Sequence, residues 1–231
     1  MTGVNRTDPL FDQVYEILWD RILSGEVTHG TRLSDLEWSK KLNVSRTPVR
    51  EAMRKLHQDG ILVQRDRGGS EVRRMNEGNL RDLYRCRAAL EGLATRDAVQ
   101  FLGPSDHAEL FGIVDTAQAA IDRDDFHEVF ELNTRFHKII TGASSNPFLE
   151  RFLLDLGRLI IFARSSLMVA AHQSETTAEY LSHLERIQTD HREIVEALQT
   201  GDPDAAAARM EAHLFSTADD MVALAHRITA T

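Results

Sequence analysis

Three histidines and one asparagine in the C-terminal part of the sequence could together bind a metal ion. Asn133 and His137 are four residues apart, which places both on one face of a single helix. His191 and His213 lie in two later segments whose apolar residues also recur at helical spacing. In a helical bundle, three imidazoles and an amide oxygen from three helices can meet around one divalent ion. Zinc is the usual ion for three imidazoles, and nickel, iron or manganese accept the same ligands.

The same residues also have a purely structural interpretation. The sequence contains ten histidines, and a histidine on an apolar helix face is commonly a hydrogen-bonded core residue rather than a ligand. His183 precedes His191 by about two helical turns, and we interpret it as part of a solvated helix face. Spacing alone therefore leaves both a metal site and a set of hydrogen-bonded histidines open.

A second group of residues with recognisable chemistry lies in the sequence VSRTPVREAMRKL at positions 44–56. A helix is expected to begin at Ser45 or Thr47, with Pro48 in its first turn, where the missing N–H is tolerated. One face of this helix is apolar, and another carries an arginine at every fourth position: Arg46, Arg50 and Arg54.

An arginine row of this kind suits a helix that enters the major groove of DNA. Arginine can bind the guanine edge through two hydrogen bonds, while hydroxyl groups and helix-start N–H groups bind phosphates. A solvated basic helix face is the alternative, and the neighbouring segments must decide between the two.

The segments around this helix predict a winged helix-turn-helix. A first helix is expected over residues 8–24 and a second over about 34–42, with a tight turn before the arginine helix. Residues 61–64 and 71–74 then form a β-hairpin with a basic, glycine-containing tip, which would be the wing. Arg65 and Arg67 at this tip could reach the DNA backbone or the minor groove.

The remainder of the sequence is helical almost throughout. Breaks at Gly103-Pro104, at 142–147 and at Gly201-Asp202-Pro203 separate segments of helical length. The fold class is therefore mainly α, with an N-terminal winged helix-turn-helix and a C-terminal antiparallel all-α bundle of about six helices. The expected helices are 77–101, 105–123, 125–142, 147–171, 176–200 and 203–228.

The distribution of charged residues divides the chain at the same place as the change from the winged helix-turn-helix to the helical bundle. Residues 1–77 contain 13 basic and 12 acidic side chains, whereas the remainder contains 14 and 24. Within residues 40–74 there are 10 basic and 4 acidic side chains, a footprint suited to nucleic acid despite the net charge of −9. We expect a DNA-binding domain over 1–76 and a helical domain over 77–231.

Cysteine content and hydropathy indicate the compartment. The single cysteine, Cys86, excludes an intramolecular disulfide and fits a reducing environment. The sequence has no apolar run long enough to cross a membrane and no signal-peptide pattern at its start. We expect a cytoplasmic protein without a membrane partner.

The N-terminal pattern resembles the GntR family of transcriptional regulators. The resemblance is carried by the motif at Gly30–Asp35, by VSRTPVREAMRKL and by the pairs Asp59-Gly60 and Arg67-Gly68. It departs from the family at Trp38, usually aliphatic, and at His29, usually proline, and neither position lies in the recognition helix. The resemblance implies DNA contacts at Arg32, Ser45, Arg46, Thr47, Arg50, Arg67 and Gly68.

The C-terminal part resembles the FCD ligand-binding domain of the FadR subfamily. The resemblance is carried by RCRAALE at 85–91, by FHKII at 136–140 and by the segment from DHREIVEAL onward. It implies a metal held by Asn133, His137, His191 and His213, although the usual first ligand is aspartate, so the neutral Asn133 implies weaker binding. It also implies a carboxylate effector at Arg87, for which a surface ion pair with Glu91 is the structural alternative.

These expectations combine into one function with two alternatives. The chain would be a dimeric transcription regulator, a repressor, that binds a pseudo-palindromic operator and responds to a small organic acid bound near the metal. In one alternative the metal itself is the signal. In the other the helical bundle is a metal-dependent enzyme, although no glutamate is placed as an obvious general base.

Overall fold

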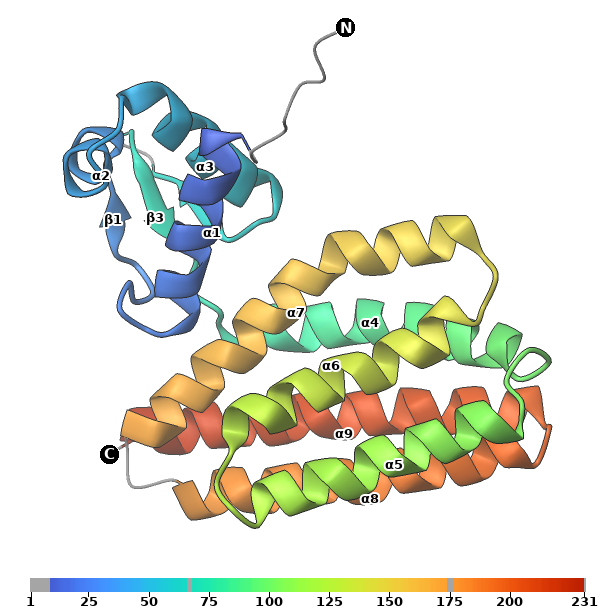
Figure 1. The fold of residues 1–231 in the computed structure, drawn as a ribbon. Helices are drawn as coiled ribbons and strands as arrows, with labels where there is room; N and C mark the ends of the chain where they lie inside the picture. The colour runs from blue at the N-terminus through green and yellow to red at the C-terminus, as the bar shows by residue number, and fades with distance from the viewer. Residues whose placement is uncertain (1–8, 66–67, 174–176, 231) are drawn as a thin grey trace, which may run out of the picture. The chain divides into compact units, whose positions relative to one another are not determined.

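A computed structural model describes residues 9–65, 68–173 and 177–230 of the chain (Figure 1). The chain divides into two compact units. The first consists of Met1–Asn76 together with Gly157–Val169, and the second of Glu77–Leu156 together with Ala170–Thr231. The fold is mainly helical, as the sequence predicts.

The first unit is a winged helix-turn-helix with a small antiparallel sheet. The strands follow the order β1-β3-β2, in which β2 and β3 form the predicted hairpin. The strand β1 was not expected from the sequence, and it pairs Arg32 with Glu71 and Leu33 with Ser70 of β3. The elements are α1 (Leu10–Leu23), β1 (Arg32–Leu33), α2 (Asp35–Lys41), α3 (Arg46–Gln58), β2 (Leu62–Gln64) and β3 (Ser70–Val72).

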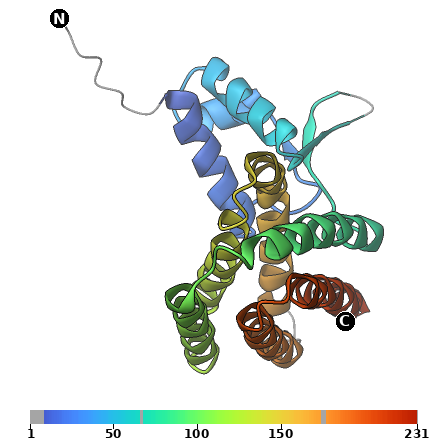
Figure 2. The same ribbon diagram turned by 90° about the vertical axis from the view of Figure 1, so that its right-hand side faces the viewer.

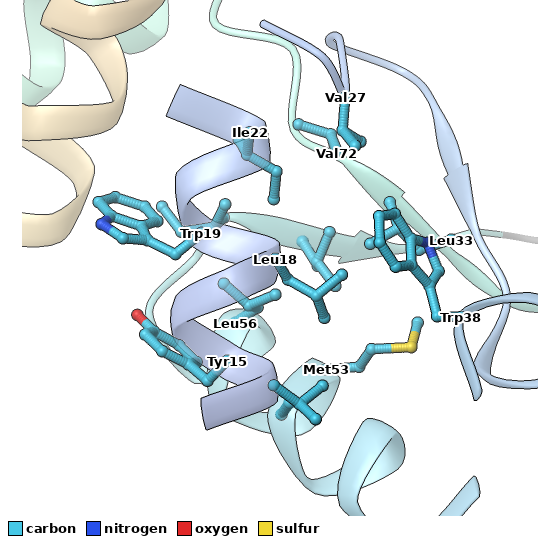
Figure 3. Close-up of a cluster of buried hydrophobic side chains, with 14 of the residues drawn as sticks. Tyr15, Leu18, Trp19, Ile22, Val27, Leu33, Trp38, Met53, Leu56 and Val72 are labelled. Carbon is cyan, nitrogen blue, oxygen red and sulfur yellow. The ribbon is translucent and has the colours of Figure 1, made fainter. Parts of the chain in front are cut away.

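An apolar core fixes helix α3 in this unit (Figure 3). Leu18 of α1 and Leu56 of α3 are completely buried, and the indole of Trp38 on α2 is buried in the same cluster. Polar contacts add to this packing, because the Tyr15 hydroxyl donates to the Asp59 carboxylate directly after α3. The arginine face of α3 is thereby left outward.

Replacing Leu56 by alanine is expected to destabilise the protein by about 2–5 kcal/mol, because it leaves a cavity in a fully packed site. Urea unfolding followed by circular dichroism measures this change. Leu36→Ala on α2 is the matched control, since Leu36 is exposed and its truncation should change stability by less than about 0.5 kcal/mol. Equal effects of the two substitutions would contradict the assigned core.

The second unit is built on a ring of five helices. Helix α4 (Glu77–Ala98) packs on α6 (Phe126–Gly142) and on α9 (Pro203–Ala230), whereas α5 (Pro104–Ile121) packs on α6 and on α8 (Thr177–Gln199). Contact between α8 and α9 closes the ring. The long axes of these helices are foreshortened in Figure 2. A sixth helix, α7 (Pro147–Gln173), completes the bundle and contributes residues to both compact units.

Local signals in the sequence explain where these helices begin and end. The Asp106 carboxylate accepts a hydrogen bond from the Gly103 N–H at the start of α5, and Asp125 caps α6 by accepting from the Glu128 N–H. Gly201 lies between α8 and α9 at φ +73°, a conformation that favours glycine. Cys86 is exposed on α4.

Over the described ranges, every helix is too short or too polar to cross a bilayer.

Candidate functional site

Three of the four predicted metal ligands meet inside the ring of helices. His137 comes from α6, His191 from α8 and His213 from α9, and all three are buried. One nitrogen from each ring lies within 4.8 Å of the others, and the Nε2 atoms of His137 and His191 are 3.3 Å apart. We call these three residues the histidine cluster.

Carboxylates outside the cluster orient two of its rings. The Nδ1 atom of His137 is 2.6 Å from Oε2 of Glu91, and the Nδ1 atom of His213 is 3.1 Å from Oδ2 of Asp190. A neutral imidazole that donates from Nδ1 carries its lone pair on Nε2. Both Nε2 lone pairs are then available for a metal, the arrangement by which carboxylates commonly prepare histidine ligands.

Burial keeps these rings in the neutral form that binds metals. It lowers the pKa of His137, and the nearby Glu91 carboxylate opposes this change without cancelling it. Burial likewise lowers the pKa of His213, against the opposing effect of Asp190. Protons therefore compete little with a metal ion for these nitrogens.

Asn133 fits the role of a fourth ligand through its amide oxygen. Its side chain is 5% exposed and lies one helical turn before His137 on α6. The Oδ1 atom is buried and has no hydrogen-bond partner among the residues that the structure describes. A buried carbonyl oxygen without a partner is unfavourable, and coordination of a cation would satisfy it. The residues present therefore fit a divalent ion.

Arg87 is buried beside the histidine cluster. It forms an ion pair with Glu91, which also contacts His137 of the cluster. Its Nε donates to Oε1 of Glu91, and both side chains are almost fully buried. The expected pair with Glu91 is therefore present, but it is buried rather than at the surface, and Glu91 accepts a hydrogen bond from His137 as well. Burial alone would raise the pKa of Glu91. The positive charge of Arg87 and the contact with His137 have a larger combined effect, so the pKa lies well below its usual value. Glu91 is thus ionised and links Arg87 to the cluster.

His183 does not belong to the histidine cluster, and the expectation that it lies on a solvated face was wrong. Its ring is buried, with Nδ1 3.2 Å from Oδ2 of Asp220 on α9. This hydrogen bond is the largest of the effects that lower the pKa of Asp220. His183 is a hydrogen-bonded core histidine, the other role that the sequence left open.

The predicted DNA-contacting residues lie on the outward side of the first unit where the structure describes them. Ser45 is the residue directly before α3, and Thr47 lies in its first turn. These two residues are exposed, as are Arg32, Arg46, Arg50 and Gly68. Arg67 lies outside the described residues. A groove of about 590 Å³ runs between α3 and the hairpin, and Arg50, Arg54 and His57 are among its lining residues.

Sequence reasoning missed the roles of the acidic residues that organise both sites. Asp35 on α2 binds both Arg46 and Arg50. Asp190 could have been noticed because it directly precedes His191, whereas Glu91 was expected one helical turn after Arg87 but only as the surface partner of that arginine. Neither signal indicates which histidine the carboxylate would meet, since those partners lie on other helices.

Comparisons with known proteins agree with the division into two units. Residues 10–72 match the family model described as "Bacterial regulatory proteins, gntR family", and residues 82–216 match the FCD domain. The second match covers more than half of the chain.

Individual relatives match nearly the whole chain. The HTH-type transcriptional repressor RspR of Escherichia coli (strain K12) is 30% identical over 213 residues, covering 92% of this chain and 89% of that protein. The probable D-xylose utilization operon transcriptional repressor of Paenarthrobacter nicotinovorans is 30% identical over 203 residues, covering 87% and 84%. The solved structure of E. coli McbR/YncC has the same fold, with a TM-score of 0.71 at 23% identity over 96% of this chain and 99% of that one.

Proposed function

The chain belongs to the GntR family of bacterial transcriptional regulators and carries an FCD domain, and from this membership we propose that it is a dimeric repressor controlled by a small organic acid. The observation that carries the effector part is the histidine cluster with Asn133 and Arg87 in the interior of the bundle. Its relatives are transcriptional regulators, which argues against an enzyme built on the bundle.

Repression and dimerisation have separate support. Two relatives that match most of the chain are described as repressors. A dimer would place two recognition helices on the two half-sites of a pseudo-palindromic operator. Phe148, Phe152 and Leu154 are large apolar side chains exposed near the start of α7, and burial in a subunit interface would remove them from water.

An organic acid fits the chemistry of the bundle interior. Three imidazoles and one amide oxygen leave positions open in an octahedral sphere of nickel, iron or manganese, and zinc can expand from four ligands to five, so a carboxylate is a suitable further ligand. A bound divalent ion would supply positive charge to hold that carboxylate, and Arg87, whose bond to Glu91 uses Nε, could bind it from the other side. The Tyr84 side chain is also buried, one turn before Arg87, and it contacts that guanidinium.

The test of this function is selection of DNA by the purified full-length protein. Random duplexes that bind it should converge on one sequence with two inverted halves, and footprinting should protect that sequence in the source genome. Analytical ultracentrifugation should give a dimer on each selected duplex. Failure to enrich any sequence, together with no protected region near its own gene, would refute the proposal.

A metal-sensing regulator is the second candidate, favoured by the convergence of three buried imidazoles. Removing the ion with a chelator and then measuring operator affinity distinguishes a metal-sensing regulator from one controlled by an organic acid. If metal alone changes the affinity, the ion is the signal. If metal has no effect until an organic acid is added, the ion serves as part of the effector site.

Replacing Asp190 by asparagine is expected to weaken zinc binding by about 10–100-fold, the usual effect of removing a carboxylate that orients a histidine ligand. Zinc affinity is measured by competition with a chromogenic chelator. Asp220→Asn is the matched control, because Asp220 binds His183, which lies outside the histidine cluster. If both variants bind zinc as the parent does, Asp190 does not orient a metal ligand.

A further inference from the structure

Asp35 joins the two arginines that are expected to read DNA. It is the first residue of α2, and Arg46 and Arg50 both lie on α3. Arg46 binds the carboxylate through two nitrogens, with Nε 3.2 Å from Oδ2 and Nη2 3.0 Å from Oδ1. Arg50 binds Oδ2 through its Nε. One carboxylate therefore holds two guanidinium groups on the outward face of α3.

The two arginines are held in different ways. The Nε–Nη2 edge of Arg46 is occupied by Asp35, and this is one of the edges with which a guanidinium forms paired hydrogen bonds. The bond from Arg50 to Asp35 uses Nε, so its terminal Nη1–Nη2 edge points away from that bond. Arg50 also lines the groove between α3 and the hairpin. Arg50 thus presents an edge that can bind guanine. Arg46 is masked, in the sense that Asp35 occupies its Nε–Nη2 edge and phosphate cannot bind there.

The charge of Asp35 acts on DNA as well as on the arginines. Its side chain is 19% exposed, much less than the 49% and 62% of Arg46 and Arg50. Hydrogen bonds from both arginines lower the pKa of its carboxyl group, so it is ionised at neutral pH. A carboxylate here partly neutralises two positive charges, and any phosphate that approaches Arg46 must compete with it.

We propose that Asp35 is a positioning residue that sets the ratio of operator affinity to non-specific DNA affinity. It orients Arg50 towards base edges and withholds Arg46 from phosphates. Non-specific binding depends almost entirely on phosphate contacts, so occupation of Arg46 weakens it. The operator adds base contacts that can displace the carboxylate from Arg46. The inference rests on the proposed DNA-reading role of α3 and adds the residue that controls its selectivity.

The test compares Asp35→Asn with Glu37→Gln on two duplexes, the sequence selected by the parent protein and a scrambled version of it. Glu37 is the matched control because it also lies in the first turn of α2 but pairs with Lys41. In the Asp35→Asn protein, the ratio of the two affinities should fall by about tenfold, the effect of one bidentate base contact. The salt dependence of its non-specific binding should steepen by about one phosphate contact. Glu37→Gln should change neither quantity.

A second variant tests the proposal without removing Asp35. Arg46→Ala should weaken operator binding while leaving non-specific affinity and its salt dependence unchanged, because Arg46 is masked in that complex. The Asp35→Asn substitution alone should raise non-specific affinity, because it frees Arg46 for phosphates. Combining Arg46→Ala with Asp35→Asn should abolish this gain in non-specific affinity. Thermal melting of each variant confirms that it is folded.

The outcomes separate this proposal from the proposed function. If the parent selects no sequence, the function itself is wrong. If the parent selects an operator but Asp35→Asn keeps its affinity ratio, or Glu37→Gln lowers the ratio equally, Asp35 has no specific role. An undiminished gain in non-specific affinity in the Arg46→Ala background would also overturn the proposal.

Discussion

Replacing Glu91 by alanine is expected to lower the free energy of unfolding by about 3–5 kcal/mol, the usual consequence of leaving one member of a buried ion pair uncompensated. The Arg87 guanidinium would remain in the interior without its carboxylate, and His137 would lose the acceptor of its Nδ1 proton. Urea denaturation in the presence of a chelator measures the change without any contribution from bound metal.

A double substitution separates this effect from simple loss of packing. Arg87→Met combined with Glu91→Leu removes both charges and retains apolar volume, so it should cost much less than Glu91→Ala alone. Asp155→Ala is the surface control, because Asp155 forms an exposed pair with Arg151 and should contribute less than about 1 kcal/mol. If the double variant is as unstable as Glu91→Ala, an uncompensated charge is not the cause.

Replacing Arg50 by alanine is expected to abolish specific DNA binding while leaving the fold intact. Each bidentate arginine–guanine contact contributes about 1–3 kcal/mol to discrimination, and a dimer would lose one in each half-site. Arg50 is exposed, and its bond to Asp35 is an exposed polar contact, so stability should change little. Fluorescence anisotropy with the selected and scrambled duplexes measures the loss.

Arg54→Ala is the matched control for Arg50→Ala. Arg54 lies one turn further along α3 and pairs with Glu51, which places it among surface charges. Its removal should weaken binding to both duplexes by a similar factor, as expected of a phosphate contact. A variant at Arg50 that still distinguishes the duplexes would show that another residue reads the bases.

The helices of both units were predictable because their signals are local. The apolar spacing of Val49, Met53 and Leu56 predicted the packed face of α3, and these residues are buried as expected. Proline and glycine at Pro104 and Gly201 marked helix boundaries. The meeting of His137, His191 and His213 was also predicted, because a bundle brings inward-facing residues of neighbouring helices together.

Features that depend on distant partners were not predictable. The strand β1 has two residues, and it exists through pairing with β3 about 40 positions later in the sequence. His183 was assigned to a solvated face, whereas Asp220, 37 residues away, provides a buried partner. The contact of Glu91 with His137 joins positions 46 residues apart. Sequence spacing fixes the face of a helix on which a residue lies, but it does not specify which neighbour covers that face.

The single exposed cysteine provides a direct means of observing how a dimer would respond to its effector. Cys86 lies on α4 immediately before the buried Arg87, and the chain contains no other thiol that would react with a probe. A nitroxide label attached to Cys86 would therefore mark one position per subunit without any mutation of the protein. In a dimer, electron spin resonance between the two labels would report changes in the spacing of the α4 helices as zinc, organic acid and operator DNA are added in turn.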